Sequence, residues 1–185
     1  MNSLDSPQQS KIRKFNSTHR LIAAGIFIAL MFCAFLLLKK VPTSPDQLFD
    51  RYFETYALTT SAGQSEDPVR MALHAAYSAQ EYRAAISAFD QLTDVTDLDH
   101  LLMANSYMAI GRPAGGLSSL TKVIEGKSSL RPEARWYLAL TYVKLNDLTS
   151  AGVLAQAVVE SDPARASKAR KLFDELQRNN ASLLN

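Results

Sequence analysis

Residues 135–163 read RWYLALTYVKLNDLTSAGVLAQAVVESDP, and their spacing predicts two helices joined by a tight turn. The residues that recur at helical spacing in the two halves are Leu138, Ala139, Tyr142, Ala151 and Ala155. Asn146 stands between the halves, and Asn tolerates the left-handed conformation that ends a helix. The stretch therefore predicts an antiparallel helix pair, with small residues where the two axes approach closely.

The same pattern occurs twice upstream, so the chain repeats itself from Pro68 onward. Ala85, Gly116 and Ala151 take equivalent places in three successive units, 31 and 35 residues apart. Small residues also recur on the first helices, at Ala72, Ala104 and Ala139. Pro68, Pro113, Pro132 and Pro163 each suit the first turn of a helix, and Gly111 suits a helix end. No stretch alternates as a half-buried strand does, which predicts an all-α protein without a sheet.

The spacing of Leu138, Ala139, Tyr142, Ala151 and Pro163 resembles the tetratricopeptide repeat family, over about residues 66–179. The second repeat departs from the family pattern, with Gly116 for the usual Ala and Ser128 for the closing Pro. The resemblance implies a TPR-like α-solenoid of about three helix-turn-helix repeats. Residues 163–179 would form its capping helix, with Arg165 and Lys168 among the basic residues in solvent, and residues 180–185 a disordered tail.

Residues 21–38 (LIAAGIFIALMFCAFLLL) contain no charged residue and no proline, which predicts a single transmembrane helix from Leu21 to Leu38. At 1.5 Å per residue this stretch is roughly 27 Å long, close to the hydrocarbon thickness of a bilayer. A buried core helix or a cleavable signal peptide is the alternative, but Leu36–Leu38 lead directly into Lys39 and Lys40 rather than into a cleavage site. Cys33 is read as a lipid-facing residue.

Charge is distributed unevenly along a chain whose formal net charge is +2. Residues 1–20 carry four Lys/Arg and one Asp, whereas residues 41–162 carry nine Lys/Arg against fifteen Asp/Glu, a difference of −6. The basic N-terminal side favours a cytoplasmic N-terminus, so the repeat domain would lie in the periplasm of a Gram-negative bacterium or in a eukaryotic lumen. Residues 1–20 are expected to form a disordered cytoplasmic tail. The order of tail, span and repeats resembles small membrane-anchored repeat proteins of Gram-negative bacteria. Because Lys39 and Lys40 follow the span, a repeat domain facing the cytoplasm remains the alternative.

Residues 39–65 are expected to link the span to the repeats. Within this linker, LFDRYFETYAL (residues 48–58) places Leu48, Phe49, Tyr52, Phe53 and Tyr56 at helical spacing and predicts a short amphipathic helix.

The composition argues against catalytic and metal-dependent functions. One Cys and three His provide neither a disulfide framework nor a multi-thiolate metal site. No GxGxxG, P-loop, GxSxG or HExxH motif occurs, so we expect a protein that is not an enzyme and has no cofactor. The acidic repeats also lack a basic stripe for nucleic acid. Asp94, Asp97 and Asp99 suit a helix start better than a cation site.

Protein binding remains, and arrays of this kind bind through the concave face of their first helices. Residues at i, i+4 and i+7 spacing line the expected groove: Arg70, His74, Tyr77, Leu101, Asn105, Met108, Trp136, Leu140 and Val143, with Lys144 beside them. These residues do not match the set of Lys, Arg and Asn with which some members of the tetratricopeptide repeat family bind the C-terminal carboxylate of a chaperone. The mainly apolar groove suits a helix or peptide of a partner, or the chain's own LFDRYFETY stretch. Trp136 is either the anchor of such a partner or a core residue. A self-associating structural component is the alternative function.

Overall fold

The computed structural model describes residues 43–58 and 66–183, together with Ile28, Leu30 and Met31. Within these residues every regular element is helical and none is a strand, which confirms the all-α class. The elements of the array are α2 (Pro45–Tyr52), α3 (Pro68–Ser78), α4 (Tyr82–Phe89), α5 (Asp97–Ala109), the 3₁₀-helix η1 (Pro113–Gly116), α6 (Leu117–Glu125), α7 (Arg131–Lys144), α8 (Leu148–Ser161) and α9 (Ala166–Leu183).

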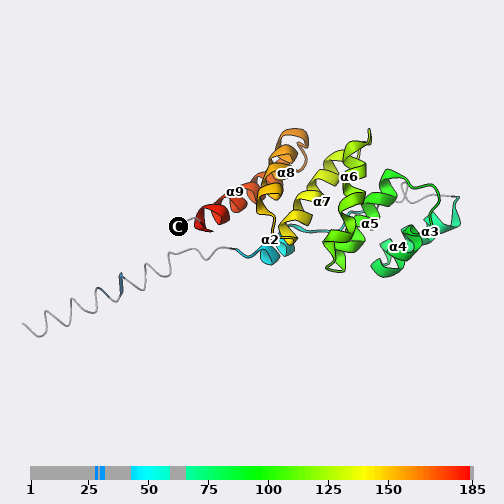
Figure 1. Ribbon diagram of the computed structural model, residues 1–185, viewed down its shortest axis with the longest axis horizontal. Helices are drawn as coiled ribbons and strands as arrows, with labels where there is room; N and C mark the ends of the chain where they lie inside the picture. The colour runs from blue at the N-terminus through cyan, green and yellow to red at the C-terminus, as the bar shows by residue number, and fades with distance from the viewer. Residues whose placement is uncertain (1–27, 29, 32–42, 59–65, 184–185) are drawn as a thin grey trace, which may run out of the picture. The chain divides into compact units, whose positions relative to one another are not determined.

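The helices from α3 to α9 pack against one another in chain order. Figure 1 shows them as a row of hairpins, α3 with α4, α5 with α6 and α7 with α8, followed by α9. The first helices of neighbouring pairs also touch, α3 against α5 and α5 against α7. The arrangement is compatible with helical repeats, and it gives the row a continuous face made of first helices.

The ends of the first helices repeat in atomic detail. Gln80, Gly111 and Asn146 each have a positive φ, of 62°, 72° and 61°, at intervals of 31 and 35 residues. The residue after each of them donates its N–H to a carbonyl five positions earlier: Glu81 to Ala76, Arg112 to Tyr107 and Asp147 to Tyr142, at 2.8–2.9 Å. These bonds form the left-handed cap that satisfies the last carbonyls of a helix. The period read from the sequence is therefore also the period of the helix ends.

Small residues lie where the hairpins are tightest, with one exception. Ala85, Ala104, Ala139 and Ala151 are fully buried. Ala72 is exposed instead, and Leu73 points into the core of the first hairpin. In the first unit, the residue that faces the core is thus Leu73, one position later than the repeat pattern of small residues predicts.

Two helix starts and the C-terminal helix end differ from the sequence prediction. Pro113 begins η1, and α6 begins only at Leu117. Pro163 lies in a turn, because Asp162 accepts hydrogen bonds from the N–H groups of Ala164 and Arg165 and so moves the start of α9 to Ala166. At the other end α9 continues to Leu183, into residues 180–185 that the sequence assigned to a disordered tail.

No helix among the described residues is long and apolar enough to cross a membrane. The predicted span, Leu21–Leu38, lies outside the described residues except for Ile28, Leu30 and Met31. The predicted tail over residues 1–20 and the linker residues 39–42 and 59–65 also lie outside them.

Candidate functional site

The face of first helices is covered by an earlier part of the same chain, residues 43–58, which we call the covering segment. Its helix α2 contacts α7 and α9, and its remaining residues continue toward α5 and α3. We call the side of α3, α5, α7 and α9 that it contacts the first-helix face. This is the surface that the sequence predicted as a partner groove, and the chain's own LFDRYFETY stretch lies on it.

The covering segment is half helix and half extended chain. Ser44 caps α2, because its hydroxyl accepts from the N–H of Gln47 while the Gln47 side chain accepts from the N–H of Ser44. The helix ends at Tyr52, and Phe53 has an extended backbone with φ −78° and ψ 124°. The prediction of a helix over residues 48–58 is therefore wrong for residues 53–58. Backbone groups of Glu54 and Tyr56 find partners on the first-helix face instead of within a helix.

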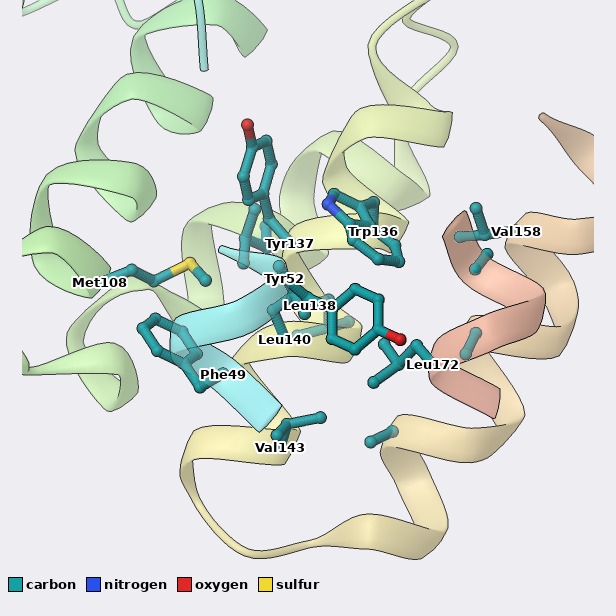
Figure 2. Close-up of a cluster of buried hydrophobic side chains, with 14 of the residues drawn as sticks. Phe49, Tyr52, Met108, Trp136, Tyr137, Leu138, Leu140, Val143, Val158 and Leu172 are labelled. Atoms are coloured by element: carbon teal, nitrogen blue, oxygen red, sulfur yellow. The ribbon is translucent and has the colours of Figure 1, made fainter. Parts of the chain in front are cut away.

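The apolar side of α2 is buried against α7, α9 and α5. Leu48, Phe49 and Tyr52 belong to the main core cluster, together with Trp136 and Leu172. Figure 2 shows Phe49 and Tyr52 on α2 facing the α7 side chains, with Leu172 and Met108 on either side. The Tyr52 ring meets Trp136 edge-on at 6.3 Å between centroids, and this geometry is favourable for aromatic pairs.

The extended half is held through its main chain by one side chain from each first helix. Tyr137 of α7 donates its hydroxyl to the Glu54 carbonyl at 3.1 Å. The N–H of Tyr56 donates to Asn105 Oδ1 of α5 at 3.0 Å. Tyr77 of α3 donates its hydroxyl to the Tyr56 carbonyl at 2.9 Å. Residues 54–56 are thus bound as an extended peptide across three successive helix pairs.

The groups that make these bonds are fixed by burial and by their own neighbours. Asn105 donates its amide to the Leu101 carbonyl at 3.0 Å, which turns its Oδ1 toward the covering segment. Burial raises the pKa of the Tyr77 and Tyr137 hydroxyls well above the usual value for tyrosine, so both remain protonated donors at neutral pH.

Charged residues add a second set of contacts along α2. Lys144 lies 2.7 Å from Asp46 and 4.9 Å above the Phe49 ring. Arg51 pairs with Glu175, which also accepts the Tyr52 hydroxyl at 2.9 Å. Because Asp46 and Arg51 are largely exposed, such ion pairs contribute only about 0–1 kcal/mol each and mainly fix the register.

Two further contacts involve α9, whose residues the sequence analysis placed in solvent or in the helical cap. Lys168 lies 3.1 Å from Glu54 and over the Trp136 ring, and Asn179 donates to the Thr43 carbonyl at 2.7 Å. Arg165 pairs with Glu133 and Asp162 instead of facing solvent.

The structure divides the ten predicted groove residues into three groups. Tyr77, Asn105, Trp136 and Lys144 contact the covering segment directly. Four more are buried in the main core cluster, to which the apolar residues of α2 also belong: Leu101, Met108, Leu140 and Val143. The other two, Arg70 and His74, lie beside Asp99 in a separate polar cluster between α3 and α5.

That polar cluster joins two helices of the array. Arg70 Nε lies 3.0 Å and His74 Nε2 3.4 Å from the carboxylate oxygens of the fully buried Asp99. Burial alone raises the pKa of Asp99, but hydrogen bonds from Thr96 and Arg70 outweigh it and hold the pKa below its usual value. Thr96 and Asp99 also form the capping box of α5, as expected for an acidic residue at a helix start.

Sequence reasoning missed Tyr137, Lys168, Glu175 and Asn179 as contacts of the covering segment. Lys168, Glu175 and Asn179 recur on one side of α9 at helical spacing, which is the signal that could have assigned this side to the same face.

Within the described part of the chain, no three His, Cys, Asp or Glu residues come together as metal ligands would. No protein-family model, curated protein or solved structure matches this chain.

Proposed function

We propose that this chain is a membrane-anchored, non-enzymatic scaffold for protein contacts, whose first-helix face binds a segment of a partner protein. The observation that carries the proposal is the binding of the main chain of residues 54–56 by Tyr137, Asn105 and Tyr77. Hydrogen bonds to a main chain do not depend on the sequence of the peptide, whereas the surrounding aromatic contacts select its side chains. A partner segment with the same pattern can therefore take the same place.

The covering segment indicates the pattern that this face accepts. It has aromatic residues at Phe49, Tyr52 and Phe53 and carboxylates at Asp46 and Glu54, which meet Lys144 and Lys168. The preferred partner is thus a short acidic and aromatic helix that continues into extended chain. Because the covering segment is attached to α3, its effective concentration is high, and a partner binds only as the covering segment leaves.

Self-association is the second candidate function, and it uses the same contacts. A second copy of this chain carries an identical covering segment, so two copies can exchange segments without any other partner.

The proposed anchoring by Leu21–Leu38 in the bacterial inner membrane, with the array in the periplasm, rests on the apolar run and the charges around it. A C-terminal reporter that is active only in the cytoplasm would reverse this orientation.

Competition with a synthetic peptide tests the proposal. We would titrate a fluorescent peptide with the sequence of residues 43–58 into the purified full chain in detergent and measure anisotropy. Tyr52→Ser with Phe53→Ser weakens the attached segment, and the free peptide should then bind more tightly, by up to about tenfold for each 1.4 kcal/mol of weakening. Trp136→Ala, added to this double variant, should abolish the gain because it removes the ring that meets Tyr52.

Two controls separate this result from unfolding. Asp50→Ser alters an exposed residue of the covering segment and should leave peptide binding as in the unmodified chain. The free peptide should also raise the melting temperature of the Tyr52→Ser, Phe53→Ser chain, measured by far-UV circular dichroism. If a folded double variant binds no peptide, the proposal is wrong.

A further inference from the structure

A second apolar surface lies between α8 and α9. It is an open cleft of about 460 Å³, and its lining contains no charged residue: Leu148, Thr149, Gly152, Val153, Gln156, Phe173, Leu176, Gln177 and Asn180. Among these lining residues, the side chain of Val153 is 68% exposed. A Cβ added to Gly152 would meet no atom within 4 Å, so the floor of the cleft is open.

Two strongly exposed hydrophobic side chains lie on α8 or in the turn directly before it. Within residues 43–58 and 66–180, three large hydrophobic residues are strongly exposed: Met71, Leu145 and Val153, at 52%, 41% and 68%. Leu145 lies in the turn between α7 and α8, directly before the helix that lines the cleft. Met71 lies on α3, whereas the cleft is lined by residues of α8 and α9. Figure 1 shows α3 at one end of the row and α8 with α9 at the other.

The covering segment begins at the same end of the array. Asn179, next to the cleft residue Asn180, donates to the Thr43 carbonyl at 2.7 Å, and Lys144 pairs with Asp46 at 2.7 Å. Only residues 39–42 separate Thr43 from Leu38, the last residue of the apolar run. Even fully extended, five residue steps reach at most about 18 Å. Thr43 is therefore always within this distance of the end of the apolar run.

We propose that this end of the array, with Leu145, Val153 and the α8–α9 cleft, rests on the headgroup region of the bilayer. The inference depends on the proposed function, since it requires Leu21–Leu38 to span that bilayer. An uncharged apolar surface held close to an interface is buried there in preference to water. The exposed cation of Arg178, beside Asn179, suits the anionic headgroups at that level.

Depth measurements with a single fluorophore test this contact in the full chain. Cys33 is the only cysteine in the sequence, so Cys33→Ser allows one new cysteine at a time to carry an NBD dye. We would label Val153→Cys or Leu145→Cys in nanodiscs that contain lipids spin-labelled near the headgroup. Both dyes should lose most of their emission and shift to the blue. A dye at Met71→Cys, equally apolar but on α3, should keep its aqueous emission.

Substitutions at Gly152 provide a matched pair, because a Cβ there meets no atom within 4 Å and the residue lines the open cleft. Gly152→Leu should preserve the quenching at Leu145→Cys, whereas Gly152→Glu should reduce it by placing a carboxylate against anionic lipid. If the chain stays in the nanodisc but all three dyes remain in water, only this inference is overturned. If the chain does not remain in the nanodisc at all, the membrane anchor of the proposed function fails with it.

Discussion

At the scale of single residues, the covering segment is recognised by neutral hydroxyl and amide groups and by aromatic rings. Tyr77, Asn105 and Tyr137 bind its backbone, and Trp136 and Tyr137 contact its aromatic side chains. The Phe53 ring lies at 6.4 Å from Tyr137 and at 4.8 Å from Phe49, so one aromatic cluster joins the helical and extended halves. The rings thus make the larger contribution to recognition of such a segment, and its carboxylates add weaker ion pairs with Lys144 and Lys168.

Alkaline pH should release the covering segment through Tyr52. Burial and the hydrogen bond to Glu175 raise its pKa from 10.0 to about 12. A pKa that is higher in the folded state than in the unfolded state adds stability that is complete below pH 10.0 and is lost as the pH rises toward about 12. Urea unfolding between these pH values should show a falling free energy of unfolding. Tyr52→Phe should flatten part of that fall, and an equally steep fall would contradict this role.

Part of the residue-level prediction follows from geometry alone. Tyr77, Asn105, Trp136 and Lys144 were found because first-helix positions project at fixed intervals toward one face. Arg70 and His74 share this spacing, yet Asp99 on the adjacent helix binds them, and spacing does not reveal which neighbour a long or polar side chain selects. Tyr137 was not predicted because it directly follows Trp136 and so falls outside the i, i+4 and i+7 spacing of the groove. Two adjacent helical residues contact the same segment only where that segment is broad enough to reach both.

At the scale of elements, the helix pairs are set by close approaches between small residues. A Cβ on Gly116 would lie 2.8 Å from Ala104 Cα and 2.9 Å from Ala104 Cβ, and Ala104 is a fully buried residue of α5. Gly152 occupies a comparable second helix, but a Cβ there meets nothing within 4 Å. The two glycines therefore differ: Gly116 allows close packing against Ala104, whereas Gly152 lines the cleft between α8 and α9.

This difference predicts opposite effects of the same substitution. Gly116→Ala should destabilise the array by about 1–3 kcal/mol, because α5 and α6 must move apart. Gly152→Ala should be neutral or stabilise by up to about 1 kcal/mol through its higher helix propensity. Urea unfolding of the full chain measures both. Equal effects of the two substitutions would show that the close approach at Gly116 is not limiting.

Element boundaries were predictable only where local signals decide them. The ends at Gly111 and Asn146 follow from residues that tolerate positive φ, whereas Gln80 adopts the same conformation without such a signal. In the covering segment, the helical spacing of Leu48, Phe49 and Tyr52 predicted α2. The extended course of residues 53–58 depends on three distant side chains, so local sequence could not indicate it.

At the scale of the whole molecule, the covering segment runs against the order of the array. It starts at α9, crosses α7 and α5, and reaches α3, so it contacts each successive helix pair. The sequence predicted the helical class, the period of the helix pairs and the apolar face that the covering segment occupies. It left open whether a partner, a second copy or this chain itself occupies that face, because the same apolar positions serve all three.

The central claim is that the first-helix face holds the covering segment of its own chain. Photo-crosslinking tests it most directly, with p-benzoylphenylalanine in place of Phe53 in an equal mixture of isotopically light and heavy full-length chains. The structure predicts crosslinks from position 53 to the α7 peptide that contains Tyr137, and only within light or within heavy chains. Mixed light–heavy crosslinks, or no crosslink to α7, would contradict it.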